Sequence, residues 1–160
     1  MRLAVVVVNK QSRRINRRRL ARLARAVIAA ECRRSADSCH RDAELTVVIG
    51  DDEWIRELNR KYLKRDAPTD VLAFPQEPKP GCFTRPAGSR PVLGDVAISA
   101  DTAARQAEEL GHALEEELAV LVTHGILHLT GWSDETPAQR RRMMRRVQEL
   151  LVQAQQDLES

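Results

Sequence analysis

Short runs of apolar, often β-branched residues alternate along this chain with longer stretches in which apolar residues recur every three or four positions. The first pattern is typical of buried strands and the second of amphipathic helices. The apolar runs predict four strands, over residues 3–8, 44–49, 71–74 and 92–99, the last one broken at Gly94-Asp95. The longer periodicity predicts helices over residues 17–30, 52–63, 101–110 and 112–130, and a last helix that begins at Pro137.

Residues that favour helix ends stand at most of the predicted boundaries. Asn16 and Asp101 precede helical patterns, and their short polar side chains can accept hydrogen bonds from the free N–H groups of a first turn. Thr136 and Gln139 have the spacing of a capping box. Gly131 follows the fourth helix and suits a left-handed turn that ends it.

Strands mixed with helices predict an α+β fold, with a small mixed β-sheet packed by helices, in a single domain over residues 1–160. The helix 112–130 is apolar on most of its faces, so we expect it to be central and buried. We expect Tyr62 to face inward from the second helix, and Met143 and Met144 to fill the core under the last one.

Charge is distributed unevenly, although the formal net charge is only +3. Nine of the 26 Lys and Arg residues lie within residues 1–30, which contain no acidic residue. A second basic cluster occupies residues 140–146. Such clusters are typical of proteins that bind a polyphosphate, but they also occur on solvated helix faces, and composition alone does not separate the two.

Residues 75–91 contain five of the seven prolines and predict a long loop, which we interpret as a mobile flap between strands. Three cysteines, an odd number without a C-x-x-C pair, favour a reducing compartment. The apolar start of the chain is too short for a signal peptide, and no run approaches the ~20 apolar residues of a membrane span. We therefore expect a soluble, cytoplasmic protein that has no membrane partner.

The segment from His124 to Asp134 carries the strongest chemical signal. His124 and His128 are about one helical turn apart, so their imidazoles can converge on one metal ion. A turn at Gly131 can bring Asp134 back as a third ligand. This H-x-x-x-H-x-x-G-x-x-D spacing is that of metzincin peptidases, but Gly125 stands where a peptidase has its catalytic Glu. Three protein ligands leave a position open, as in catalytic zinc sites, so we expect one zinc ion per chain and a substrate other than a peptide.

Three blocks of sequence support a family assignment. They are L-N-R-K-Y at 58–62 with D-A-P-T-D-V-L-A-F-P at 66–75, L-G-D-V-A-I-S at 93–99, and the segment 106–134 with its two histidines. In order and spacing they resemble the YbeY family of single-strand-specific, metal-dependent endoribonucleases, over about residues 44–150. The resemblance implies an α+β fold, a catalytic zinc ion, and a role in the maturation of small-subunit ribosomal RNA and in ribosome quality control.

Two positions depart from the family's pattern. The signature H-G-x-L-H-L-x-G-Y-D-H ends on a third His ligand, whereas this chain has Asp134 there. Asp is a legitimate zinc ligand, and it can shift the preference towards Mn²⁺ or another divalent ion. Glu135 is an alternative ligand. The Arg that follows the family's Tyr is Leu63 here, and we expect Arg65 to make its contact with phosphate, with Arg60 as the alternative.

The resemblance also implies ribosomal RNA and the ribosome, or proteins of its small subunit, as partners. We expect catalysis to depend on His124, His128 and Arg65. Basic helix faces are expected to bind the RNA backbone, and Trp132 to stack on a base or to form a lid over the metal helix. The expected RNA-binding residues are Arg18, Arg22, Arg25, Trp132 and Arg141. The alternative is a non-catalytic, ribosome-associated RNA-binding factor with a structural metal, which both departures favour.

Overall fold

The computed structural model describes residues 3–34, 43–76 and 92–159. Every predicted strand and helix is present in this part of the chain, so the predicted α+β class is confirmed. The flap expected over residues 75–91 falls almost entirely outside the described residues. In chain order the elements are β1 (Ala4–Asn9), α1 (Arg17–Arg34), β2 (Glu44–Gly50), α2 (Asp52–Leu63), β3 (Val71–Pro75), β4 (Val92–Ser99), α3 (Ala100–Leu110), α4 (Leu114–Leu129) and α5 (Pro137–Glu159).

The strands form one mixed sheet in the order β1-β2-β4-β3. Strands β1, β2 and β4 are parallel, and β3 runs antiparallel to β4 at the edge. Strand β4 was predicted to break at Gly94-Asp95, but it is continuous. It continues through a bulge at Leu93, where its register against β2 shifts by one residue. Gly94 has a φ of +148°, and a Cβ there would stand 2.5 Å from the carbonyl oxygen of Phe74, so this bulge requires glycine.

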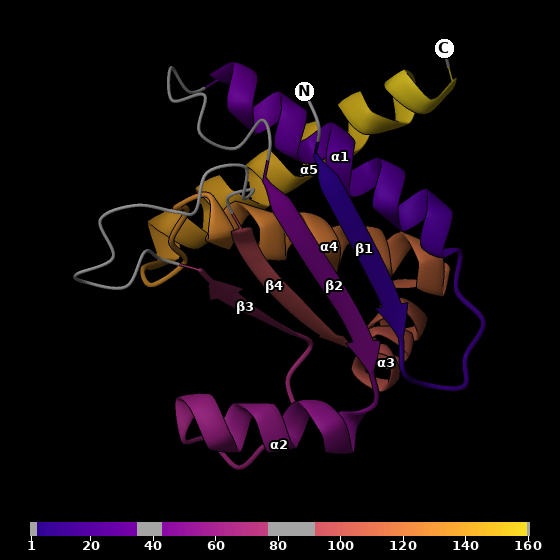
Figure 1. Cartoon of the computed structure of the whole chain (residues 1–160), viewed down its shortest axis with the longest axis vertical. Helices are drawn as coiled ribbons and strands as arrows, with labels where there is room; N and C mark the ends of the chain where they lie inside the picture. Colours follow the sequence, from indigo (N-terminus) through magenta and orange to yellow (C-terminus); the bar gives the residue numbers. More distant parts are fainter. Residues whose placement is uncertain (1–2, 35–42, 77–91, 160) are drawn as a thin grey trace, which may run out of the picture.

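Helices α1, α4 and α5 cover one face of the sheet, and α2 covers the other (Figure 1). The larger hydrophobic core lies under the three-helix layer, and a smaller one lies under α2. Helix α4 contacts β3, β4 and the helices α1, α3 and α5, and its residues Leu118, Val122 and Ile126 are fully buried. The prediction that this helix is central and buried is therefore confirmed. No helix in the described ranges is both long and apolar enough to cross a membrane.

Two predicted core residues are on the surface instead. Tyr62 is 56% exposed at the end of α2, and its ring meets the edge of the Phe74 ring, with the centroids 5.5 Å apart. Met144 is 44% exposed, whereas Met143 is fully buried. Adjacent residues on a helix point about 100° apart, so only one of the two methionines can face the sheet.

The helix caps agree with the sequence except at α3. The side chain of Asn16 accepts a hydrogen bond from the N–H three residues later, at 3.1 Å. Thr136 and Gln139 form the predicted capping box, each side chain accepting from the backbone N–H of the other, at 3.1 and 3.0 Å. At α3 the capping residue is Ser99. Asp101, predicted for this role, lies in the first turn, where its carboxylate is bound from outside the helix.

Helix α1 runs to Arg34, one turn beyond its predicted end. Distant residues stabilise this extra turn. Glu31 is buried and accepts hydrogen bonds from Trp132 Nε1 at 3.1 Å and from Arg146 Nε at 2.7 Å. Because these partners lie about a hundred residues away, the local pattern could not predict the extension. It brings the end of α1 to the loop that follows α4.

Candidate metal centre

Gly125 fixes how helix α4 sits on the sheet. A Cβ at this position would stand 2.6 Å from Val96 Cγ1 and 2.9 Å from Val96 Cγ2, closer than such atoms approach in proteins. The missing side chain lets α4 lie directly on β4. Position 125, which holds the catalytic Glu in the peptidases, therefore faces the core here and has no room for a carboxylate. Its neighbour His124 points to a different side of the helix, together with His128.

The loop after α4 turns back as predicted. Gly131 has a φ of +105°, a value that L side chains rarely adopt. Its N–H donates to the carbonyl of His128 at 3.2 Å, and the N–H of Trp132 donates to the carbonyl of Leu127 at 3.0 Å. These two bonds form a Schellman motif, which closes the helix and reverses the chain. Asp134 is thereby returned to the histidines.

Three possible ligand atoms converge at this point. The Nε2 atoms of His124 and His128 are 3.1 Å apart, and Asp134 Oδ2 lies 3.7 and 3.3 Å from them. Two atoms bound at about 2.0–2.2 Å to a tetrahedral zinc ion lie about 3.3–3.6 Å apart, so the three distances are within about 0.2 Å of those that one ion requires. The three side chains are 20%, 27% and 40% exposed, which leaves the site open to solvent on one side.

A backbone carbonyl orients one of the imidazoles. His128 Nδ1 lies 3.2 Å from the carbonyl oxygen of Trp132. A carbonyl can only accept, so the Nδ1–H of His128 donates to it and the lone pair of Nε2 points at the cluster. This is the partner that metal-binding histidines usually have. The turn at Gly131 therefore brings Asp134 close to the two histidines and also places the carbonyl of Trp132 that orients His128.

The electrostatic environment keeps His124 uncharged. Burial lowers the pKa of His124 below its usual value, and the nearby His128 lowers it further, while Asp134 and Asp70 act in the opposite direction. An uncharged imidazole has the lone pair that a metal ligand needs, so the site is suited to a cation at neutral pH.

Neither Glu135, the alternative ligand, nor Arg65, the third predicted catalytic residue, belongs to this cluster. Glu135 is exposed and is not part of the converging group. Arg65 is exposed in the connection between α2 and β3. Its backbone N–H donates to the carbonyl of Asn59, and this hydrogen bond helps to close the last turn of α2. Among the described residues Arg65 has no ion-pair partner. This connection leads to Asp70, whose carboxylate is close enough to act on His124.

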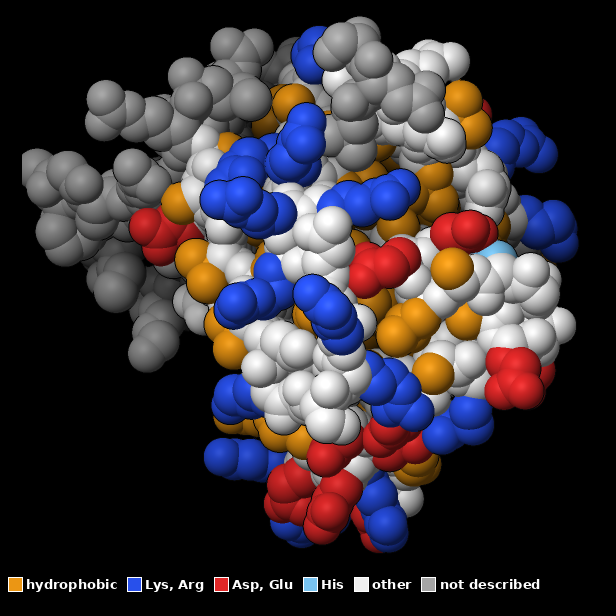
Figure 2. Space-filling view, turned by 90° about the vertical axis from the view of Figure 1, so that its right-hand side faces the viewer, with side chains coloured by type: hydrophobic (Ala, Val, Ile, Leu, Met, Phe, Trp, Pro, Cys, Tyr) orange, Lys and Arg blue, Asp and Glu red, His pale blue; other side chains and the backbone are white. Residues whose placement is uncertain are grey.

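The predicted RNA-binding residues of α1 lie far from the loop over residues 130–136, which we call the metal loop. Arg18, Arg22 and Arg25 are exposed on the first half of α1, and Lys and Arg side chains run in a broad band down the side of the molecule where this helix begins (Figure 2). The metal loop is on the opposite side in Figure 1. With a rise of about 1.5 Å per residue, Arg18 is about 24 Å along the helix from Arg34, the residue that reaches the loop.

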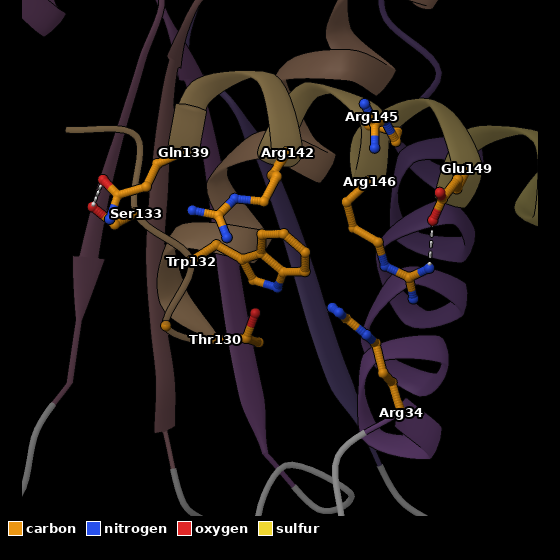
Figure 3. Close-up of a pocket in the computed structure, with 10 residues that line it drawn as sticks. Arg34, Thr130, Trp132, Ser133, Gln139, Arg142, Arg145, Arg146 and Glu149 are labelled. Atoms are coloured by element: carbon orange, nitrogen blue, oxygen red, sulfur yellow. Dashed lines mark hydrogen bonds and ion pairs between the residues drawn. The ribbon is translucent and has the colours of Figure 1, made fainter. Parts of the chain in front are cut away.

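A pocket of about 620 Å³ opens beside the metal loop (Figure 3). The ring of Trp132 forms one wall. The guanidinium of Arg34 lies over this ring, 4.8 Å from its centroid, and the ring is partly buried against the core. Arg141, the predicted RNA contact on α5, does not line the pocket. We call this space the arginine pocket, after the lining residues Arg34, Arg142, Arg145 and Arg146.

Sequence reasoning found only part of this pocket. The sequence indicates a basic cluster over residues 140–146. Arg142 and Arg145 lie about one helical turn apart and share a face of the helix, whereas Arg141 points to another side. Arg34 is not among the predicted residues, because the pattern predicts a helix that ends at residue 30, whereas α1 continues to Arg34. The adjacent pair Arg33-Arg34 at the end of a basic helix was the one signal that could have indicated it.

Comparison with known proteins identifies the family. A family model described as Endoribonuclease YbeY matches residues 6–155. The chain belongs to the YbeY family. It is 39% identical over 159 residues to the Endoribonuclease YbeY of Thermobifida fusca, covering 98% of this chain and 97% of that protein. It is 46% identical over 111 residues to that of Aquifex aeolicus, covering 69% of each.

A solved structure agrees with the YbeY fold described above. The solution structure of a Thermotoga maritima protein superimposes with a TM-score of 0.56 at 21% identity, covering 96% of this chain and 93% of the other. The family resemblance and the fold that it implied are thus confirmed. Asp134, which stands in the place of the third His of the family's signature, converges with His124 and His128 in this chain.

Proposed function

We propose that this YbeY-family chain is a metal-dependent endoribonuclease that cuts single-stranded RNA and acts in the maturation of small-subunit ribosomal RNA and in ribosome quality control. Relatives that carry the name Endoribonuclease YbeY support the reaction. The observation that carries it is the convergence of His124, His128 and Asp134 in a partly exposed site beside four arginines. We further propose a cytoplasmic protein that works with the ribosome or proteins of its small subunit.

The proposed cofactor is one divalent ion per chain. Two imidazole nitrogens and one carboxylate oxygen fit zinc, and the harder oxygen ligand of Asp134 extends the choice to Mn²⁺. When bound, the ion would supply a Lewis acid for a phosphodiester and a water molecule of lowered pKa. His124 and His128 are the remaining ligands.

The chain's own residues have three tasks in this proposal. The backbone carbonyl of Trp132 accepts a hydrogen bond from Nδ1–H of His128, so that Nε2 of the same ring stays directed at the cluster. Asp134 adds a negative charge that balances a cation. Arg65, in the connection that leads to Asp70, is the proposed contact for the reacting phosphate, since a guanidinium binds phosphate through two parallel N–H groups.

The test compares metal content per chain and cleavage of a single-stranded RNA in the wild type and three variants. His128→Ala and Asp134→Ala are expected to lose both the ion and the cleavage. Glu135→Ala is the matched control, because it removes an exposed carboxylate next to the site, and it is expected to retain both. The same RNA annealed to its complement is expected to remain intact.

Two outcomes would change the proposal. If Asp134→Ala keeps its ion while Glu135→Ala loses it, the third ligand is Glu135. If the wild type keeps one ion per chain and binds RNA without cutting it, the chain is an RNA-binding factor with a structural metal. Arg65→Ala is expected to lower the cleavage rate at unchanged metal content, and an unchanged rate would remove Arg65 from the catalytic set.

A further inference from the structure

The arginine pocket carries more positive than negative charge among the described residues. Arg146 is the one member with a clear structural role, since it binds Glu31 at 2.7 Å and Glu149 at 3.1 Å. Arg34, Arg142 and Arg145 have no ion-pair partner among the described residues. Glu31 and Glu149, which also lines the pocket, offset only part of the charge of the four arginines, and the remaining positive charge favours the binding of an anion.

The walls of the pocket come from three parts of the fold. Arg34 ends α1, Arg142 and Arg145 lie one turn apart on α5, and Trp132 belongs to the metal loop (Figure 3). The buried carboxylate of Glu31 binds Trp132 and Arg146 at once, and so ties these three parts together. These buried contacts fix Trp132 and Arg146, and the Trp132 ring positions Arg34, before a ligand arrives, which lowers the entropy cost of binding.

Trp132 connects the pocket to the metal centre. Its ring lines the pocket, and its carbonyl oxygen accepts from His128. Asp134 lies two residues further on, so the Cα atoms of Trp132 and Asp134 are at most about 7.6 Å apart. A strand that crosses the metal centre can therefore reach the neighbouring pocket within a few nucleotides.

We propose that the arginine pocket binds a phosphodiester group of single-stranded RNA, a few nucleotides from the bond positioned at the metal centre. Arg142 and Arg145 contact the phosphate, and Arg34, held over the Trp132 ring, closes the pocket from the opposite side. The position of the cut rests on the proposed endoribonuclease function, whereas the binding of the strand does not. The pocket thus sets how far an RNA must extend on one side of the cleaved bond.

The experiment measures the affinity for a labelled single-stranded RNA by fluorescence anisotropy, with a chelator present so that no cleavage occurs. Each lost phosphate contact lowers the slope of log K against log salt by about 0.7, which corresponds to about fivefold in affinity at 0.1 M salt relative to 1 M. Because both arginines contact the same phosphate, the double variant Arg142→Gln with Arg145→Gln is expected to bind about fivefold more weakly at 0.1 M salt and like the wild type at 1 M.

The matched control is the double variant Arg56→Gln with Lys61→Gln. It removes the same charge from exposed positions on α2, across the sheet from the pocket. We expect its affinity and salt slope to equal those of the wild type. An equal loss in both double variants would show a general charge effect and overturn the proposal. Thermal unfolding of each variant checks the fold, and Arg142→Lys with Arg145→Lys is expected to restore most of the salt slope.

Cleavage assays separate this inference from the proposed function. If the wild type does not cut RNA but the pocket variants lose affinity, the endoribonuclease proposal fails and the pocket stands. If the wild type cuts RNA and the Arg142→Gln and Arg145→Gln variant binds as tightly as the wild type, the pocket fails and the function stands. RNAs shortened from either end complete the test, because cleavage is expected to fall sharply when the strand on one side no longer reaches the pocket.

Discussion

The contact between Gly125 and Val96 yields a prediction in which one substitution changes sign with its background. In a helix, Gly→Ala normally stabilises by about 1 kcal/mol, because alanine loses less backbone entropy on folding. Here the added Cβ would stand 2.6 Å from Val96 Cγ1. Overpacking of a core costs about 1–3 kcal/mol. Gly125→Ala alone is therefore expected to destabilise the protein by about 1 kcal/mol.

Shortening the opposing side chain removes the cause. Val96→Ala deletes both Cγ atoms of a fully buried residue and is expected to cost about 2–3 kcal/mol. In that background the new Cβ at position 125 would meet only the Cβ of residue 96, at 3.4 Å, which is an ordinary contact. Gly125→Ala then fills part of the cavity and is expected to stabilise by about 1 kcal/mol. The coupling energy of the two substitutions is about 2 kcal/mol.

Urea unfolding of the four proteins measures this cycle directly. Metal content on the same samples adds a functional readout, since a shift of α4 moves His124 and His128, and the double variant is expected to hold its ion better than Gly125→Ala. If Gly125→Ala stabilises the wild type, or changes the free energy of unfolding equally in both backgrounds, the close packing of α4 on β4 is not the reason for the glycine.

Three further substitutions test single interactions. Although burial raises the pKa of Asp52, hydrogen bonds from Ser99 and two other side chains bring it below the usual value of 3.8. Because the pKa is lower in the folded state, the charged carboxylate of Asp52 stabilises the fold above pH 3.8, and this contribution is lost as the pH falls through the folded pKa. Asp52→Asn is therefore expected to cost about 1 kcal/mol at pH 7 and nothing in acid below the folded pKa. Denaturant unfolding across pH measures this difference. Thr136→Ala removes one partner of the capping box with Gln139 and is expected to lower the free energy of unfolding by about 1 kcal/mol. Gly131→Ala forces an L residue into a φ of +105°. It is expected to cost about 1–2 kcal/mol and to weaken metal binding in a titration, because the same turn returns Asp134.

Local signals predicted the elements but failed where distant residues decide. The capping box at Thr136 and the turn at Gly131 depend on neighbours within one helical turn, and both were predicted correctly. The end of α1 depends on Glu31, whose partners lie on α5 and in the metal loop. The bulge at Leu93 depends on the register of β4 against β2. The contact at the end of α1 leaves no mark in its own segment of sequence, and the glycine next to the bulge indicated a break in the strand rather than a bulge.

The sequence by itself determined the class of the fold, the family and the convergence of two histidines on one helix. Hydrophobic periodicity and the spacing of His124 and His128 are local properties, which a chain carries before it folds. Asp134, the proposed third ligand, was indicated by its spacing and is brought within reach by the turn at Gly131.

Only the tertiary structure decided what surrounds that centre. Gly125 looked like a missing catalytic residue, and its packing against Val96 gives it a structural reason. The arginine pocket assembles side chains more than a hundred positions apart, from Arg34 to Arg145. No pattern within either helix marks them as neighbours, because the packing of α1 and α5 around a buried carboxylate creates the site.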